Sequence, residues 1–260
     1  MMNEDGRKSI IETVLIRSAA WMNDYIKSLY SRDEEIQRMM LSKEKHTGQV
    51  RSICRSLALH LHFSPSETAL AELMGLLHDT GRFRQFTLYR TFNDAISVDH
   101  AALGLEIIEK AALLQPLSKD EQAIVIFAIQ NHNKKEIAWG KEERQNLFAR
   151  LLRDADKLDI YRVLEPLLAP SDGHGISPAF LEKFSVGEQA DYTMIHTFDD
   201  RKLVRLMWVY DINFSWTLQR IVERGYIDKI IHCLPANEAI ETGIRRLQAY
   251  VAQKCATPDI

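Results

Sequence analysis

The sequence has few of the residues that interrupt helices. Its 260 residues include 11 glycines and 7 prolines, and it contains neither an internal repeat nor a low-complexity tract. The apolar residues recur at intervals of three and four, which is the period of a helix with one buried face. At 46% hydrophobic residues, the chain is long enough to bury a full core. We therefore predict an all-α fold, a helical bundle followed by additional C-terminal helices.

Disulfide pairs, secretion signals and membrane spans also lack support. The three cysteines, Cys54, Cys233 and Cys255, are far apart and form no CxxC motif, which is typical of reduced thiols. The N-terminus becomes polar at once, unlike a secretory signal. The longest apolar runs, such as AIVIFAI at 123–129, are much shorter than the roughly 20 residues of a membrane helix. We expect a cytoplasmic protein with no membrane role.

The chain has no excess of positive charge. Its 33 Lys and Arg residues are outnumbered by 36 Asp and Glu residues, which gives a formal net charge of −3. A protein that binds nucleic acid usually carries a basic surface that neutralises phosphates. We therefore expect no nucleic-acid polymer as a partner, and the sequence leaves the oligomeric state open.

Several helix starts can be identified from capping residues. Residues 64–67 (SPSE) and 118–121 (SKDE) have a serine followed three residues later by a glutamate, the pattern of a capping box. Asp99 is placed to cap a helix that begins at His100. The first of these helices is expected to end at Gly81. The segment from about 33 to 62 is amphipathic and predicts one long helix or a broken pair.

One segment has the composition of a long surface loop. Residues 169–180 (APSDGHGISPAF) concentrate Gly, Pro, Ser and Asp. We expect a helical core with an N-terminal helix at 1–168, and a C-terminal helical extension at 181–260 that packs on the core as one compact unit. Two further loops, at 82–99 and 133–145, are expected to determine the substrate.

Histidine and aspartate residues recur at the ends or on the buried faces of the predicted helices. Taken alone, each histidine is more often a core or surface residue than a metal ligand. Imidazole and carboxylate are, however, the usual ligands of iron, manganese and zinc, so their joint arrangement favours a metal site. The candidate ligands are His46, His78, Asp79, His100, His132 and Asp156.

In order and spacing, these residues resemble the pattern of the HD-domain superfamily over about residues 40–165. The segment ADKLD at 155–159 resembles the last motif of that family, which favours Asp156 over Asp154 as the ligand. Asp154 and Asp159 are then expected behind the ligands or at the surface. His100 and His132 resemble the additional histidines of members that bind two metal ions, and Asp79 would bridge those ions.

The resemblance implies a metal-dependent phosphohydrolase that acts on a nucleotide or other small phosphate ester through a metal-activated water. Two divalent ions, with Fe or Mn favoured and Mg, Co or Zn also compatible, would lower the pKa of that water. Asp79 and Arg82 are the catalytic candidates, and the Arg82 guanidinium could bind a substrate phosphate. Arg84 and Lys157 are weaker candidates. Some family members have an acidic pair where this chain has Gly81 and Arg82, so their mechanism does not transfer directly.

Other interpretations of the pattern remain open. The six-ligand order also resembles the mixed-valent di-iron oxygenases of this fold, which cleave C–C or C–P bonds. A non-catalytic sensor that binds metal and nucleotide is a second alternative. A purely structural role for all six residues predicts that the purified protein retains no metal. His174, in the 169–180 loop, is a weak candidate for covering the site.

Overall fold

The computed structural model describes residues 4–138, 140, 142–171, 173–190 and 194–259. Throughout these ranges the regular structure is helical and contains no strand, so the prediction of an all-α fold with additional C-terminal helices is confirmed. The chain divides into two compact units, Met1–Asp159 and Ile160–Ile260. How the two units pack against each other stays a prediction.

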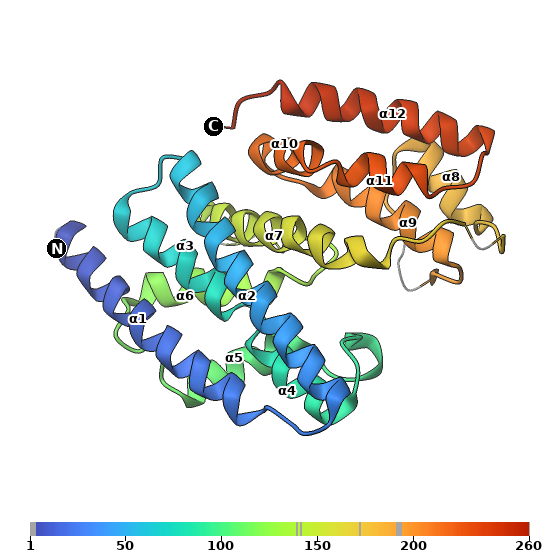
Figure 1. Cartoon of the computed structure of the whole chain (residues 1–260). Helices are drawn as coiled ribbons and strands as arrows, with labels where there is room; N and C mark the ends of the chain where they lie inside the picture. The colour runs from blue at the N-terminus through green and yellow to red at the C-terminus, as the bar shows by residue number, and fades with distance from the viewer. Residues whose placement is uncertain (1–3, 139, 141, 172, 191–193, 260) are drawn as a thin grey trace. The chain divides into compact units, whose positions relative to one another are not determined.

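The first unit is a bundle in which one apolar helix occupies the centre. Helix α3 packs against both α1 and α2, and it also contacts α6. Eleven of the 13 residues of α3 are buried, so this helix forms the middle of the core (Figure 1). The elements of the unit are α1 (Glu4–Ser28), α2 (Glu34–His60), α3 (Pro65–Leu77), α4 (Thr80–Tyr89), η1 (Asp94–Ile96), α5 (His100–Lys110), α6 (Lys119–Asn131) and most of α7 (Glu143–Leu164).

The predicted helix starts agree with the structure. Ser64 and Ser118 form capping boxes with Glu67 and Glu121, and the Asp99 side chain accepts hydrogen bonds at the start of α5. The amphipathic segment forms one continuous helix, α2. The apolar face of this helix is buried, as its amphipathic pattern predicts, and includes Ile36, Met40, Val50, Ile53 and Leu57.

The prediction that the apolar helix ends at Gly81 is wrong. Helix α3 ends at Leu77, and a new helix, α4, begins at Thr80, so Gly81 lies in the first turn of α4. A Cβ atom at Gly81 would lie 2.1 Å from the backbone oxygen of His100. The glycine is therefore needed for the close approach of α4 to α5, and the break between α3 and α4 falls at the His78–Asp79 pair.

The second unit contains its own helices and buried polar contacts. Helix α8 packs against α9 and α12, and α10 packs against α11 and α12. The Asp199 carboxylate forms a buried ion pair with Lys202 at 2.7 Å. The elements are η2 (Glu165–Leu167), α8 (Pro178–Val186), α9 (Phe198–Met207), η4 (Trp208–Asp211), α10 (Ser215–Glu223), α11 (Tyr226–His232) and α12 (Glu238–Cys255).

Two further predictions, on membrane-spanning helices and on the cysteines, can also be compared with the structure. In the part of the chain that it describes, no helix has both the length and the apolar composition needed to span a membrane. The three cysteines are free thiols, with Cys54 buried and Cys233 and Cys255 partly exposed.

Candidate metal centre

The six residues singled out in the sequence all lie in the first unit and come together in its interior. They come from α2, from the junction of α3 and α4, from the start of α5, from the end of α6 and from α7. The side chain of Asp156 is 13% exposed and is the most accessible of the six. The six are His46, His78, Asp79, His100, His132 and Asp156.

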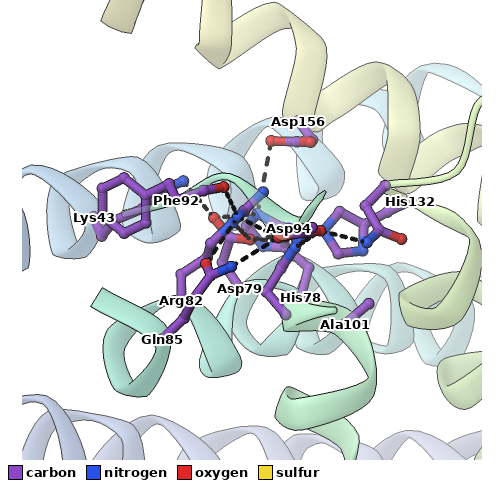
Figure 2. A network of polar contacts seen from close by, with 12 residues as sticks. Lys43, His78, Asp79, Arg82, Gln85, Phe92, Asp94, Ala101, His132 and Asp156 are labelled. Atoms are coloured by element: carbon purple, nitrogen blue, oxygen red, sulfur yellow. Dashed lines mark hydrogen bonds and ion pairs between the residues drawn. The ribbon is translucent and has the colours of Figure 1, made fainter. Parts of the chain in front are cut away.

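Asp79 lies between two pairs of histidines, with one carboxylate oxygen facing each pair. Its Oδ2 atom lies 3.5 Å from Nε2 of His46 and 3.5 Å from Nε2 of His78. Its Oδ1 atom lies 3.4 Å from Nε2 of His100 and 3.6 Å from Nε2 of His132. Figure 2 shows Asp79 together with His78 and His132 in this network. Asp79 therefore offers one carboxylate oxygen to each histidine pair.

Asp156 completes the group around the Oδ2 side of Asp79. Its Oδ1 atom lies 3.1 Å from Nε2 of His46 and 3.7 Å from Nε2 of His78. The potential ligand atoms of His46, His78 and Asp156 lie within 4.8 Å of one another, and so do those of His78, Asp79 and His132. These distances define two overlapping ligand groups.

In two of the histidines, a hydrogen bond to a backbone oxygen determines which ring nitrogen carries the proton. His78 Nδ1 donates to the backbone oxygen of Gly75 at 2.9 Å, and His132 Nδ1 donates to that of Ile129 at 2.7 Å. A carbonyl oxygen can only accept, so Nδ1 carries the proton in both rings. In the neutral ring, the Nε2 lone pair then points into the centre, as a metal ligand requires.

The other two histidines are held by carboxylates. His46 Nδ1 lies 2.7 Å from Oδ2 of Asp159, and His100 Nδ1 lies 2.7 Å from Oδ2 of Asp94. A carboxylate behind a histidine ligand fixes the ring orientation and makes the inner nitrogen a better ligand. Asp159 is buried behind His46. Asp94 was missed in the sequence, where it is one of several polar residues in an apparent loop.

The inward-facing Nε2 atoms of the four histidines lie close together in two pairs. Nε2 of His46 lies 3.4 Å from Nε2 of His78, and Nε2 of His100 lies 2.9 Å from Nε2 of His132. Two lone pairs at these distances repel unless a proton or a cation lies close to both. Together with the carboxylates of Asp79 and Asp156, this donor set fits divalent cations.

Burial adjusts the charge of the site. It lowers the pKa of His78 to about 4 and that of His100 to about 4, so both rings are neutral at neutral pH. For His46, burial and Lys43 lower the pKa, but the hydrogen bonds with Asp156 and Asp159 outweigh them and raise it.

Two cationic side chains flank Asp79 beside an aromatic ring. Lys43 Nζ lies 2.7 Å from Oδ2 of Asp79, and Arg82 Nε lies 3.7 Å from Oδ1. Lys43 and Arg82 lie 5.2 Å and 5.9 Å from the centre of the Phe92 ring. Arg82 was identified from the sequence and Lys43 was not. The available signal was its position three residues before His46, which places both side chains on one face of α2.

The weaker sequence candidates have different environments. Arg84 is exposed on α4. Lys157 follows Asp156 on α7, and burial holds its pKa well below the usual range. Asp154 is buried on α7. His174 belongs to the second unit, so its role in covering the site stays a prediction.

Comparison with known proteins gives one informative match. No curated protein and no solved structure matched the chain. The family model of the HD domain matches residues 44–161. That range includes all six candidate ligands, and the members of the family are all-α and mostly metal-dependent hydrolases. By this comparison, residues 44–161, nearly all of which lie in the first unit, are similar to the HD domain.

Proposed function

We propose that this protein is a metal-dependent phosphohydrolase that acts on a small phosphate ester, with a nucleotide as the favoured substrate. The observation that carries the proposal is the position of Asp79, whose two oxygens each face a different pair of histidine Nε2 atoms. A carboxylate in this position suits a site for two divalent ions. The proposed ligands are His46, His78, Asp79, His100, His132 and Asp156.

The ligand set suggests which ions bind and what they supply. Four imidazoles and two carboxylates favour iron or manganese, and Mg, Co and Zn are also compatible. When bound, such ions would supply a water of lowered pKa and would stabilise the negative charge that develops on the phosphoryl group.

Arg82 is the proposed phosphate-binding residue and the second catalytic candidate beside Asp79. Its Nη1 atom is held by the backbone oxygen of Phe92 and by hydrogen bonds of 2.9 Å to Gln85 and 2.8 Å to Asp94. These contacts fix the plane of the guanidinium close to Asp79. Its Nε atom is buried and has no hydrogen-bond partner among the described residues. A planar, oriented guanidinium suits the binding of phosphoryl oxygens.

The proposal is tested by measuring metal content and turnover together. The purified protein is analysed for metals and assayed for phosphate release from nucleotides and simple phosphate esters, without oxygen, in the presence of Mn, Fe, Mg or Co. We expect stoichiometric metal and phosphate release. Oxygen consumption with a polyol or a phosphonate would instead support a di-iron oxygenase. Binding of metal and nucleotide with no turnover under any condition would support a sensor.

A further inference from the structure

Asp94 receives hydrogen bonds from donors on two sides of the candidate site. Its Oδ2 atom accepts from His100 Nδ1 at 2.7 Å and from Asn133 Nδ2 at 3.0 Å. Its Oδ1 atom accepts from Arg82 Nη1 at 2.8 Å and from Gln85 Nε2 at 2.8 Å. Figure 2 shows Asp94 among the labelled side chains of this network. One carboxylate therefore contacts both a proposed ion ligand and the proposed phosphate-binding arginine.

We propose that Asp94 is a positioning residue that couples His100 to Arg82, so that an ion held by His100 and a phosphate dianion held by Arg82 strengthen each other's binding. This inference rests on the proposed function. It assigns to Asp94 a role that neither the motif nor the ligand set contains.

The first link in the coupling is the hydrogen bond between His100 and Asp94. It selects the ring form in which Nδ1 carries the proton and Nε2 faces the centre. An ion bound at Nε2 withdraws electron density from the ring, which makes the Nδ1–H group a stronger donor. Ion binding therefore tightens the contact with Asp94 and restricts the movement of its carboxylate.

The second link is the contact between Asp94 and Arg82, and Gln85 supports it. Gln85 is fully buried. Its amide nitrogen donates to Asp94, to Ser97 Oγ at 2.9 Å and to the backbone oxygen of Val98 at 3.0 Å. Its side-chain oxygen accepts from Arg82. A carboxylate fixed in this way holds the guanidinium in one orientation, and so it reduces the loss of freedom when an anion binds.

The chemistry of these contacts identifies the most informative substitution. The four side chains that contact the Asp94 carboxylate all act as donors, and a carboxylate offers two accepting oxygens. An asparagine of the same size offers one oxygen and one NH₂ group. Whichever way the amide of Asp94→Asn turns, its NH₂ group faces another donor, either that of His100 or that of Arg82. The variant keeps the volume of the side chain but cannot keep both links.

Asp99 offers a matched control in the same segment. It precedes His100 and accepts hydrogen bonds from the backbone of α5, from Asn133 and from Lys134. Asparagine caps helices about as well as aspartate does, so Asp99→Asn should preserve the start of α5. The control thus removes one negative charge near His100 and leaves the contact between Asp94 and Arg82 in place.

The test measures Mn²⁺ binding to the full chain by calorimetry, with and without inorganic phosphate. In the wild type we expect two ions per chain, with phosphate tightening the weaker ion by about tenfold. In Asp94→Asn the weaker ion should lose on the order of 10–100-fold in affinity, and phosphate should no longer tighten it. Asp99→Asn should behave as the wild type, with the same thermal midpoint.

Each outcome bears on a different claim. A wild type that binds no Mn²⁺ would overturn the proposed function itself. A wild type that binds Mn²⁺ without any effect of phosphate, or an Asp94→Asn variant with unchanged coupling, would overturn the inference alone. If Asp94→Asn does not fold, Arg82→Gln provides the test. It should keep Mn²⁺ affinity and lose the phosphate effect, and retention of that effect would contradict the proposal.

Discussion

At the scale of single residues, the candidate centre depends on which nitrogen of each histidine faces inward. His78 and His132 direct Nδ1 to backbone oxygens, and His46 and His100 direct it to carboxylates. All four rings therefore present Nε2 to Asp79. Contacts behind the rings fix these orientations, so the candidate ligand atoms are held in place by the protein alone.

Lys43 is expected to oppose metal binding in the absence of substrate. Its ammonium group lies 2.7 Å from the Asp79 oxygen that faces His46 and His78. It both occupies that oxygen and repels a divalent ion nearby. We predict that Lys43→Met binds Mn²⁺ about tenfold more tightly, which corresponds to about 1.4 kcal/mol. Calorimetric titration with Mn²⁺ measures the effect.

Lys45 provides the control for this prediction, because it lies on the same helix with its side chain partly in solvent. Lys45→Met removes the same charge away from Asp79 and should leave Mn²⁺ affinity close to that of the wild type. Weaker or unchanged binding in Lys43→Met would show that the ammonium group does not compete with the ion.

The sequence predicts the candidate ligands and also named Asp159, which lies behind His46, but it did not identify Asp94 or Lys43. The candidate ligands follow a recognisable order along the chain. Asp94 and Lys43 belong to no such pattern, because their roles depend on which side chains the folded chain brings next to His100 and Asp79. A loop aspartate and a helix lysine are common, and nothing local distinguishes these two.

At the scale of elements, the junction of α3 and α4 sets the position of Asp79, and the contact between α4 and α5 sets its distance from His100. A Cβ atom at Gly81 would meet two backbone atoms of α5, at 2.1 Å and 2.7 Å, neither of which can rotate away. We predict that Gly81→Ala separates the helices, lowers the free energy of unfolding by roughly 1–3 kcal/mol and weakens Mn²⁺ binding. Urea denaturation and metal titration measure the two effects.

Gly48 gives the matched control. It lies in α2, and a Cβ atom at this position would have no neighbouring atom within 4 Å. Alanine is the better helix former, so Gly48→Ala should raise the free energy of unfolding by roughly 0.5–1 kcal/mol. A Gly81→Ala variant as stable as Gly48→Ala would contradict the role assigned to the helix contact.

Sequence patterns predicted the starts of several helices, but they missed α4 (Thr80–Tyr89), because residues 82–99 were expected to form a loop. They also misplaced the break between α3 and α4. Capping boxes and apolar spacing located the starts of α3 and α6 and the buried face of α2. Gly81 was interpreted as the end of a helix because glycine commonly has that role. A glycine required by a neighbouring helix has the same local signature, and only the three-dimensional contact distinguishes the two.

At the scale of the whole molecule, the candidate centre lies in the first unit. The second unit is held together by hydrogen bonds of its own. The Asp200 carboxylate accepts hydrogen bonds from Ser177, through both its backbone and its hydroxyl group, and from the backbone of His196 and Thr197. These contacts tie Ser177, the residue before α8, to the start of α9. The loop predicted at 169–180 therefore ends earlier than expected, because α8 begins at Pro178.

We therefore predict that Asp200→Ala destabilises the second unit without altering the metal site. Loss of an acceptor for several donors should lower the free energy of unfolding by roughly 2–4 kcal/mol. Below the unfolding transition, Mn²⁺ affinity should equal that of the wild type, since all six candidate ligands lie in Met1–Asp159. Calorimetry gives both quantities. A folded variant with reduced Mn²⁺ affinity would show that the site depends on the second unit.

The central claim is that Asp79 is shared by two ions, because each of its oxygens faces a separate histidine pair. Elemental analysis of Asp79→Ala, with the fold checked by circular dichroism, tests this most directly. We predict two ions per chain in the wild type, and in the folded variant neither retained metal nor phosphate release. Full metal content in the variant, equal to that of the wild type, would contradict the shared role of Asp79.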